Sequence, residues 1–241
     1  LKHYHPTSVI NPGYEILQLW VSRMILMSGY LLGEIPFRRV YFHGMVRDKD
    51  GRKFSKSLNN GIDPLEVIAT YGTDALRMSM TVGIGPGCDV RFDMDKVKAY
   101  RNFTNKLWNI TRFLVMRSEG TAIPAKPHYS AKQKKQLREL AALVKKITKH
   151  LDGFEFHHAA ELLYHYTWHT FADKIIEETK PRLTGGEPGE TAHTAAFLLE
   201  IYATLLKLLH PFMPFVTEAI WAELPTTGKK KNFLMIECWP K

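Results

Sequence analysis

Cysteine is scarce in this 241-residue sequence, and long uncharged apolar stretches are missing. Cys88 and Cys238 stand far apart and neither belongs to a CxxC pair, which excludes a thiolate zinc site of that pattern and a disulfide-stapled fold. The most apolar early stretch, residues 17–32, is interrupted by Arg23, whereas a membrane span needs about 20 nearly uncharged residues. We therefore predict no membrane-spanning helix, and the low cysteine content fits a reducing cytoplasm.

The sequence also lacks internal repeats and a signal peptide. Its 45% hydrophobic and 24% charged residues are typical of a folded globular protein, and its length provides for one large domain or two modest ones. The chain begins with Leu1 rather than Met and enters structured-looking sequence at once. We expect it to be a piece of a longer protein.

Positive charge is in excess, with a net charge of +9. Residues 1–96 hold 12 basic and 10 acidic side chains, whereas residues 97–241 hold 21 and 14, including the short basic run Lys229–Lys231. A basic C-terminal part indicates a polyanionic partner such as nucleic acid. A solvated basic surface without a partner is the alternative, and charge alone favours neither.

The first third of the chain has the mixed pattern of an α/β domain. Apolar residues at helical spacing begin near Glu15, residues 40–46 predict a strand, and Asp50-Gly51 predicts a tight turn. The polar residues 53–61 predict an exposed loop. Asp63-Pro64 then signals the start of a helix, with Asp as the cap and Pro in the first turn.

From about Val97 the pattern changes to helices alone. Residues 130–133 form a capping box that opens a second long helix, and residues 158–179 and 198–209 predict two more. The first of these helices has an apolar stripe made of Val97, Tyr100, Phe103, Leu107, Ile110 and Leu114. Four long amphipathic helices with short connections pack as a bundle. We predict an α/β domain over residues 1–94 and an all-α helical bundle over residues 95–241.

The polar loop contains the run Lys53-Phe54-Ser55-Lys56-Ser57. Phosphate groups are bound by Lys ammonium groups, Ser hydroxyls and backbone N–H groups, and a mobile pair of lysines suits the charge that develops on a departing pyrophosphate. However, most loops of this composition are exposed to solvent and have no catalytic role. The five residues by themselves therefore do not establish a catalytic loop.

An ordered series of motifs surrounds this loop and extends over nearly the whole chain. The run 53–57 resembles the signature Lys-Met-Ser-Lys-Ser, with Phe54 in the Met place. The other matching segments are Pro36-Phe37, His43-Gly44, Ile62-Asp63-Pro64, Asp74-Ala75-Leu76-Arg77, Tyr100-Arg101-Asn102-Phe103 and His210-Pro211-Phe212-Met213-Pro214-Phe215. This series resembles the class I aminoacyl-tRNA synthetases. The resemblance implies the second half of a Rossmann-type catalytic domain followed by an α-helical anticodon-binding domain.

The resemblance also implies roles for individual residues in the activation of an amino acid by ATP. Lys56 would contact the ATP phosphates and stabilise the transition state, assisted by Lys53, while Ser55 and Ser57 would shape the loop. The ATP site would further include Gly13, His43, Gly44, Met45 and Val46, and Mg2+ would accompany ATP.

The amino acid would approach Glu15, Ile16 and Trp20. Trp20 and residues 43–48 favour valine, and the isoleucine, leucine and methionine enzymes are the alternatives within the family. An ordinary half-buried helix aromatic is the alternative role for Trp20. This chain departs from the family pattern at Glu15, where Asp is usual, and at two loop positions, Asn59 and Gly61.

For the helical part, the resemblance implies contacts with a tRNA, for which Arg101, Asn102, Lys106 and Arg112 are the candidate residues. The complete protein would then attach valine to valine tRNA in the cytoplasm. The first class signature, His-x-Gly-His, is absent, so we predict no adenylate formation by this chain alone. A split enzyme completed by the missing N-terminal half, and an inert tRNA-binding module, are the alternatives.

A metal site is not predicted from the eleven histidines. His165 and His169 have a spacing compatible with zinc, but no third ligand accompanies them in the sequence.

Overall fold

The computed structural model describes residues 3–225 and 232–241, the side chains of Lys56 and Pro188 excepted. Two compact units are present: residues 1–62 with 84–93 form the first, and residues 63–83 with 94–241 form the second. The basic run Lys229–Lys231 lies outside the described residues.

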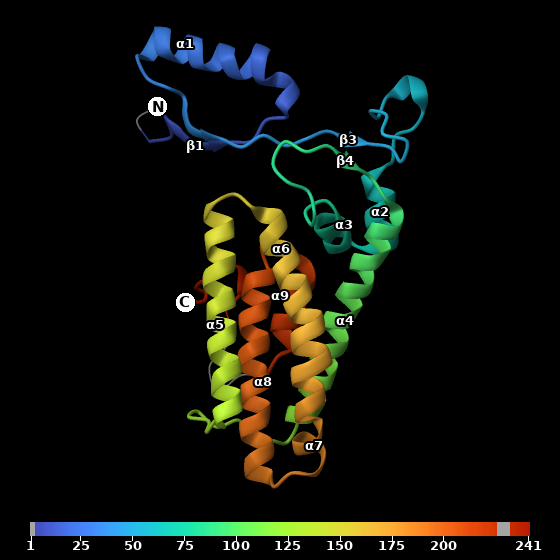
Figure 1. Ribbon diagram of the computed structural model, residues 1–241, viewed down its shortest axis with the longest axis vertical. Helices are drawn as coiled ribbons and strands as arrows, with labels where there is room; N and C mark the ends of the chain where they lie inside the picture. Colours follow the sequence, from blue (N-terminus) through green and yellow to red (C-terminus); the bar gives the residue numbers. More distant parts are fainter. Residues whose placement is uncertain (1–2, 226–231) are drawn as a thin grey trace. The chain divides into compact units, whose positions relative to one another are not determined.

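The first unit is built from short parallel strands (Figure 1). Strand β1 pairs with β2, with Thr7 opposite Phe37, and β3 pairs with β4, with Val46 opposite Val90. Parallel pairing requires a crossover connection, which α1 provides between β1 and β2. The elements are β1 (Thr7–Ile10), η1 (Tyr14–Ile16), η2 (Leu17–Val21), α1 (Ser22–Leu32), β2 (Phe37–Val40), β3 (Val46–Arg47), η3 (Lys56–Leu58) and β4 (Val90–Arg91).

The first unit differs from the sequence prediction in two elements. The predicted strand 40–46 is divided between β2 and β3. The residues between them make separate contacts, such as the bridge of His43 with Gly13 and the hydrogen bond from Gly87 N–H to the Phe42 carbonyl (2.8 Å), rather than one continuous ladder. The predicted helix near Glu15 begins with a 3-10 turn and a π-helical turn, and regular α-helix starts at Ser22.

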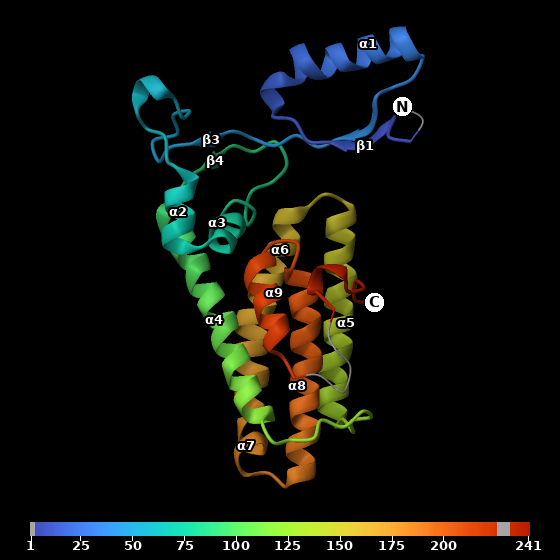
Figure 2. The same cartoon turned by 180° about the vertical axis from the view of Figure 1, so that it is seen from behind.

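The second unit is all helical, as predicted for residues 95–241, and it also includes residues 63–83, which the sequence analysis placed in the α/β domain. Its elements are α2 (Pro64–Tyr71), α3 (Thr73–Ser79), α4 (Met94–Ser118), α5 (Ala131–Asp152), α6 (Phe156–His165), η4 (Tyr166–Ile176), α7 (Glu177–Gly185), α8 (Pro188–Leu209), α9 (Pro214–Glu223) and η5 (Leu234–Ile236). Helix α4, helix α5, the continuous run of α6, η4 and α7, and helix α8 run alongside one another (Figures 1 and 2).

Most of the predicted packing and capping features of the bundle are confirmed. All six residues of the predicted stripe on α4 are buried. Ser130 and Gln133 form the capping box at the start of α5, and the Asp63 side chain caps α2 by accepting from Leu65 N–H. The predicted helix 158–179 is the middle of a longer helical run, residues 156–185, which contains an 11-residue π-helical stretch.

Helix α8 is the central helix of the bundle and contains an apolar stretch that the sequence analysis did not single out. It contacts α4, α5, α6, α7 and α9. Residues 189–209 are long and apolar enough to cross a membrane by length and composition, and 61% of the 18-residue window that meets this test is buried inside the protein. Helix α8 has apolar side chains on several of its sides because other helices pack against each of these sides.

Two distant motifs of the sequence contact each other within the second unit. Asp74 accepts hydrogen bonds from Phe215 N–H (3.3 Å) and Val216 N–H (2.6 Å). Arg77 donates to the carbonyls of Phe212 (3.1 Å) and Pro211 (3.0 Å). The Asp74 carboxylate therefore satisfies the open N–H groups at the start of α9, which has no side-chain cap of its own. Burial raises the pKa of Asp74, and the two backbone donors oppose that shift.

Replacing Asp74 by alanine should destabilise the helical unit by about 1–2 kcal/mol, because a lost helix cap costs this much. Urea denaturation followed by circular dichroism measures the change. Asp152→Ala is the matched control, since this exposed carboxylate stands at the C-terminal end of α5, where a negative charge is unfavourable. Equal stabilities of the two variants would contradict the role of Asp74 as a cap.

Candidate active site

The predicted phosphate loop, residues 53–57, follows strand β3 after a turn formed by residues 48–52. Gly51 N–H donates to the Asp48 carbonyl (2.9 Å) and closes the predicted tight turn. Gly51 has a φ of 81°, a left-handed conformation that glycine adopts without strain. Arg47 and Lys53 then face each other as an antiparallel bridge. The loop therefore starts from an ordered hairpin.

The buried carboxylate of Asp48 accepts four hydrogen bonds beneath this turn. Oδ1 accepts from the backbone N–H groups of Asp50 (3.0 Å) and Arg52 (2.8 Å), and Oδ2 accepts from Arg52 Nε (2.9 Å) and Asn60 Nδ2 (2.8 Å). These donors, first of all Asn60, lower the pKa of Asp48 from 3.8 to about 2. Because the folded-state pKa is the lower one, the contribution of Asp48 to stability is present above pH 3.8 and is lost as the pH falls through about 2.

Replacing Asn60 by alanine should raise the pKa of Asp48 towards 3.8, because the contact that lowers it most is removed. NMR titration of the Asp48 carboxyl carbon measures this pKa directly. The neighbouring variant Asn59→Gly should leave it at about 2. An unchanged value in Asn60→Ala would mean that the Arg52 donors alone hold the carboxylate in its charged form.

The structure brings the loop together with one of the residues predicted to bind the amino acid. Lys53 Nζ lies 2.7 Å from Glu15 Oε2, in an ion pair whose side chains are 53% and 38% exposed. Within the loop, the hydroxyls of Ser55 and Ser57 lie 2.6 Å apart, and Ser57 N–H donates to Ser55 Oγ (3.2 Å). A cationic group, an anionic group and two hydroxyls thus belong to one exposed site region of the first unit.

The residues predicted to lie along ATP form a second part of this region. Tyr14 N–H donates to the His43 carbonyl (3.2 Å), and His43 N–H donates to the Pro12 carbonyl (3.1 Å). A Cβ atom added to Gly13 would lie 3.4 Å from His43 Cε1 and 3.6 Å from Met45 Sδ. Gly13 therefore adjoins the predicted strip of residues 43–46.

Asp89 organises this strip, and the sequence analysis gave it no role. Its carboxylate accepts from Met45 N–H (2.8 Å) and the Tyr14 hydroxyl (3.3 Å), and it pairs with Arg47 Nε. The Met45 N–H contributes most to lowering the pKa of Asp89. The sequence held no local signal for this role, because the partners of Asp89 lie more than 40 positions away.

Gly44 occupies a position with no room for a side chain. A Cβ atom there would lie 1.9 Å from the carbonyl oxygen of Cys88 and 2.5 Å from the backbone nitrogen of Asp89. Both obstacles are backbone atoms, which cannot rotate away. Gly44 thus permits the close approach of the two chain segments that continue into β3 and β4.

The other residues predicted to bind the amino acid are exposed in this structure. Ile16 is 39% exposed and Trp20 is 57% exposed. The Arg23 guanidinium lies 5.3 Å from the centre of the Trp20 ring. The wall of an apolar pocket formed by Trp20 therefore stays a prediction.

The residues predicted to contact tRNA all lie on α4, where Arg101, Asn102 and Arg112 are exposed. Lys106 is different, since its Nζ pairs with Asp173 (3.0 Å) and lies 5.5 Å from the centre of the Trp168 ring. Trp108, which was given no role from the sequence, is 41% exposed on the same helix, seven residues from Arg101 and four from Arg112.

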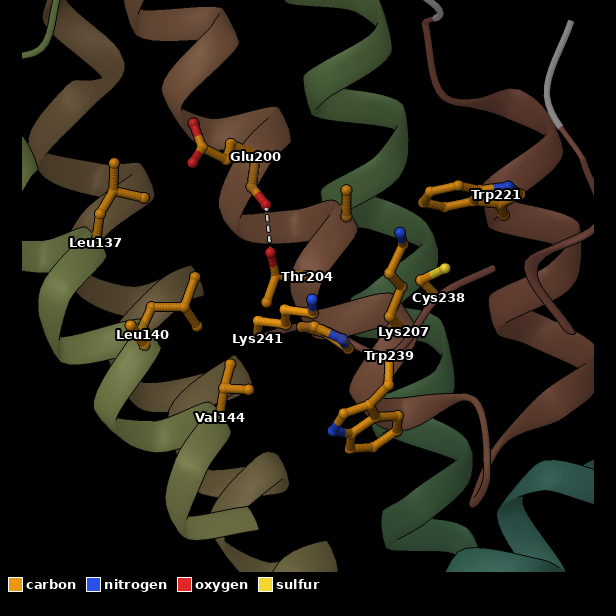
Figure 3. Close-up of a pocket in the computed structure, with 13 residues that line it drawn as sticks. Leu137, Leu140, Val144, Glu200, Thr204, Lys207, Trp221, Cys238, Trp239 and Lys241 are labelled. Carbon is orange, nitrogen blue, oxygen red and sulfur yellow. Dashed lines mark hydrogen bonds between the residues drawn. The ribbon is translucent and has the colours of Figure 1, made fainter. Parts of the chain in front are cut away.

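A cavity of about 550 Å3 lies in the helical unit, between α5, α8 and the C-terminal segment (Figure 3). Apolar residues of α5 line one side, and Lys207, Trp221 and Trp239 line the other. Trp239 Nε1 donates to Thr148 Oγ1 (2.9 Å), and Lys207 pairs with Glu237 (2.9 Å). None of the predicted site residues lines this cavity, so it is separate from the candidate active site.

Sequence comparison assigns both parts of the chain to the same kind of protein. Residues 1–93 match the family model of class I tRNA synthetases (I, L, M and V), and residues 133–241 match the anticodon-binding domain of tRNA ligases. The valine–tRNA ligase of Carboxydothermus hydrogenoformans is 44% identical over 244 residues, which cover 100% of this chain. That of Latilactobacillus sakei is 45% identical over 95% of this chain. The chain belongs to the class I tRNA synthetases.

Solved structures of this family share the fold. The LeuRS–tRNA–LeuAMS ternary complex of Agrobacterium radiobacter K84 matches 98% of this chain and 28% of that chain, with a TM-score of 0.77 and 23% identity. The Mycobacterium tuberculosis methionyl-tRNA synthetase in complex with methionyl-adenylate matches 91% of this chain and 44% of that chain, with a TM-score of 0.76 and 21% identity. The chain spans about 27% of the length of the curated relatives.

Proposed function

We propose that this chain is the part of a valine–tRNA ligase that holds the second half of the catalytic domain and the anticodon-binding domain. The complete enzyme joins valine to the AMP part of ATP and releases pyrophosphate. It then transfers valine from this adenylate to the 3′ end of valine tRNA in the cytoplasm, and AMP leaves. The observation that carries this proposal is the 44% identity to a valine–tRNA ligase along the whole chain. The loop that retains both lysines and both serines agrees with it.

The exposed ion pair of Lys53 and Glu15 fits the two substrates of the first step. Lys53 is a partner for an ATP phosphate, and Glu15 is a partner for the ammonium group of valine. An exposed ion pair contributes only about 0–1 kcal/mol, so charged substrates displace it at little cost. Lys56 and Lys53 then stabilise the charge that grows on the leaving pyrophosphate.

Magnesium would enter this site together with ATP. Among the described residues, no group of three or more His, Cys, Asp or Glu side chains is arranged to hold a metal ion. Mg2+ is commonly bound through substrate phosphates with one or two carboxylates rather than by a protein cage. Bound with ATP, Mg2+ would neutralise part of the phosphate charge, and the lysines of the loop supply the remaining positive charge.

The catalytic half needs further protein to complete it. Helix α1 has no buried residue, although it is rich in large apolar side chains. Leu26 is 71% exposed, Tyr30 86% and Leu31 65%. Apolar surface of this extent marks an interface. We assign it to the remaining part of the catalytic domain, in the same polypeptide or in a second one, and therefore expect no adenylate formation by this chain alone.

The helical unit supplies the proposed tRNA contact, through the exposed residues Arg101, Asn102 and Arg112 and the neighbouring Trp108. An exposed aromatic side chain provides a stacking surface for an unpaired base, and the arginines provide partners for phosphates. A module that binds tRNA without supporting catalysis is the second candidate function, favoured by the same exposed residues.

Binding of the chain to valine tRNA and to non-cognate tRNAs tests the helical half. At both about 50 and about 200 mM salt, we expect tighter binding of valine tRNA, with a preference that depends on the anticodon. Arg112→Ala should weaken this binding, whereas Arg38→Ala, at an exposed arginine of β2 in the first unit, is the control. If all tRNAs bind equally and this binding disappears with added salt, the interaction is only a general attraction of charges, and the proposed recognition of valine tRNA is wrong.

A further inference from the structure

The side-chain amide of Asn60 connects three points of the phosphate loop and its base. Asn60 Oδ1 accepts from Ser55 N–H (2.9 Å), and Nδ2 donates to Asp48 Oδ2 (2.8 Å) and to the Lys53 carbonyl (3.3 Å). One amide thus joins the beginning of the loop, its middle and the end of strand β3.

The residues around Asn60 hold this amide in place. Asp48 is buried and fixed by three further donors from Asp50 and Arg52. Asn59 has a φ of 46°, so the chain reverses just before Asn60 and returns it towards the start of the loop. The turn η3 fills the space between, with Leu58 N–H donating to the Ser55 carbonyl (3.2 Å). The two anchors, Asp48 and Asn60, thus enclose the whole loop.

We propose that Asn60 and Asp48 are positioning residues that together fix the loop of residues 53–57 in the conformation that presents its lysines to the substrate phosphates. The effect of these residues on catalysis rests on the proposed function, whereas their effect on the loop geometry does not. Neither side chain contacts a reacting atom in this account. Both act through the backbone of Lys53 and Ser55.

Hydrogen exchange in this chain tests the geometry without reference to activity. In Asn60→Ala, the amides of residues 53–58 should exchange about tenfold faster or more, because the hydrogen bonds to Ser55 and Asp48 are gone. The melting temperature of the helical unit should not move. Asn59→Gly is the matched control, since it removes the adjacent exposed side chain and relieves its positive φ. Loop exchange that is unchanged in Asn60→Ala would overturn the proposal.

Adenylate formation in the complete ligase tests the consequence. Asn60→Ala should lower kcat by about 30-fold with little change in the KM for valine, because misplaced catalytic groups cost rate rather than amino-acid affinity. Asn59→Gly should retain wild-type rates. Faster loop exchange combined with an unchanged kcat would overturn the positioning role. An inactive wild-type ligase would refute the proposed function instead, and the exchange data would still decide the loop geometry.

A reciprocal exchange of the two side chains separates a specific bond from a general structural effect. Asn60→Asp places two carboxylates side by side, and Asp48→Asn places two amide donors side by side, so each should slow the reaction. The double variant Asp48→Asn/Asn60→Asp restores a donor facing an acceptor between the two positions, and Ser55 N–H keeps its acceptor. The carboxylate at position 60 then meets the Lys53 carbonyl, and the amide at position 48 meets Arg52 Nε, so the repair is incomplete. We expect kcat of the double variant to recover in part, to a value above that of either single variant. If the rate losses of the two single variants instead multiply in the double variant, the proposed pairing of Asp48 with Asn60 is wrong.

Discussion

Replacing Lys56 by alanine in the complete ligase is expected to slow adenylate formation by about 10²–10³-fold, the effect of removing one group that stabilises developing charge. Binding of valine should change little, because Lys56 acts on the phosphates and does so most strongly in the transition state. Pre-steady-state measurement of adenylate formation gives the rate, and equilibrium binding of valine gives the affinity.

The structural basis of this prediction is the anchored loop that contains Lys56. The backbone of Lys56 opens the turn η3, and the hydrogen bonds of Asn60 hold the loop on both sides of it. Lys49→Ala is the control, since Lys49 is an exposed residue of the preceding turn. Equal losses in rate and in valine affinity would contradict a role in the transition state.

Replacing Gly44 by alanine is expected to disrupt the first unit and to cost more than about 3 kcal/mol of stability, the upper range for overpacking. The added methyl group would lie 1.9 Å from the Cys88 carbonyl oxygen, where ordinary contact begins at 3.4 Å. The segments must separate, which breaks the hydrogen bonds of Met45 with Val90 N–H (2.9 Å) and with Asp89 (2.8 Å). Pairing of β3 with β4 depends on these bonds.

Hydrogen exchange of the amides in β3 and β4, together with urea denaturation, measures the damage. Gly29→Ala is the matched control, because a Cβ atom there meets nothing within 4 Å and alanine favours the helix. It should be neutral or slightly stabilising. Wild-type protection of Val46 and Val90 in Gly44→Ala would show that the two segments separate at little cost, against this account.

The helical bundle was largely predictable from the sequence because its signals are local. The stripe on α4, the capping box of α5 and the Asp63 cap of α2 each involve residues within a few turns of one another. The parallel strands were less predictable. Strand β4 has two residues, too few for an alternating pattern, and its pairing with β3 is a contact between distant segments.

The candidate site was also predictable only in part. The lysines and serines of the loop were identified from adjacent residues in the sequence. The groups that hold the loop and the strip were not, because Asp48, Asn60 and Asp89 act through contacts that only the fold creates. Asp74 and the helix α9 that it caps are more than 140 positions apart in the sequence, so no local sequence pattern could predict this contact either.

Amino-acid-dependent ATP–pyrophosphate exchange by the complete protein tests the central claim most directly. We predict exchange that depends on valine and is about 100-fold slower with isoleucine or leucine, since a pocket that distinguishes single methylene groups provides discrimination of this order. The 241-residue chain alone should give no exchange above background. Exchange driven best by isoleucine, leucine or methionine would contradict the assignment to valine, and exchange by the isolated chain would contradict the need for a completing part of the catalytic domain.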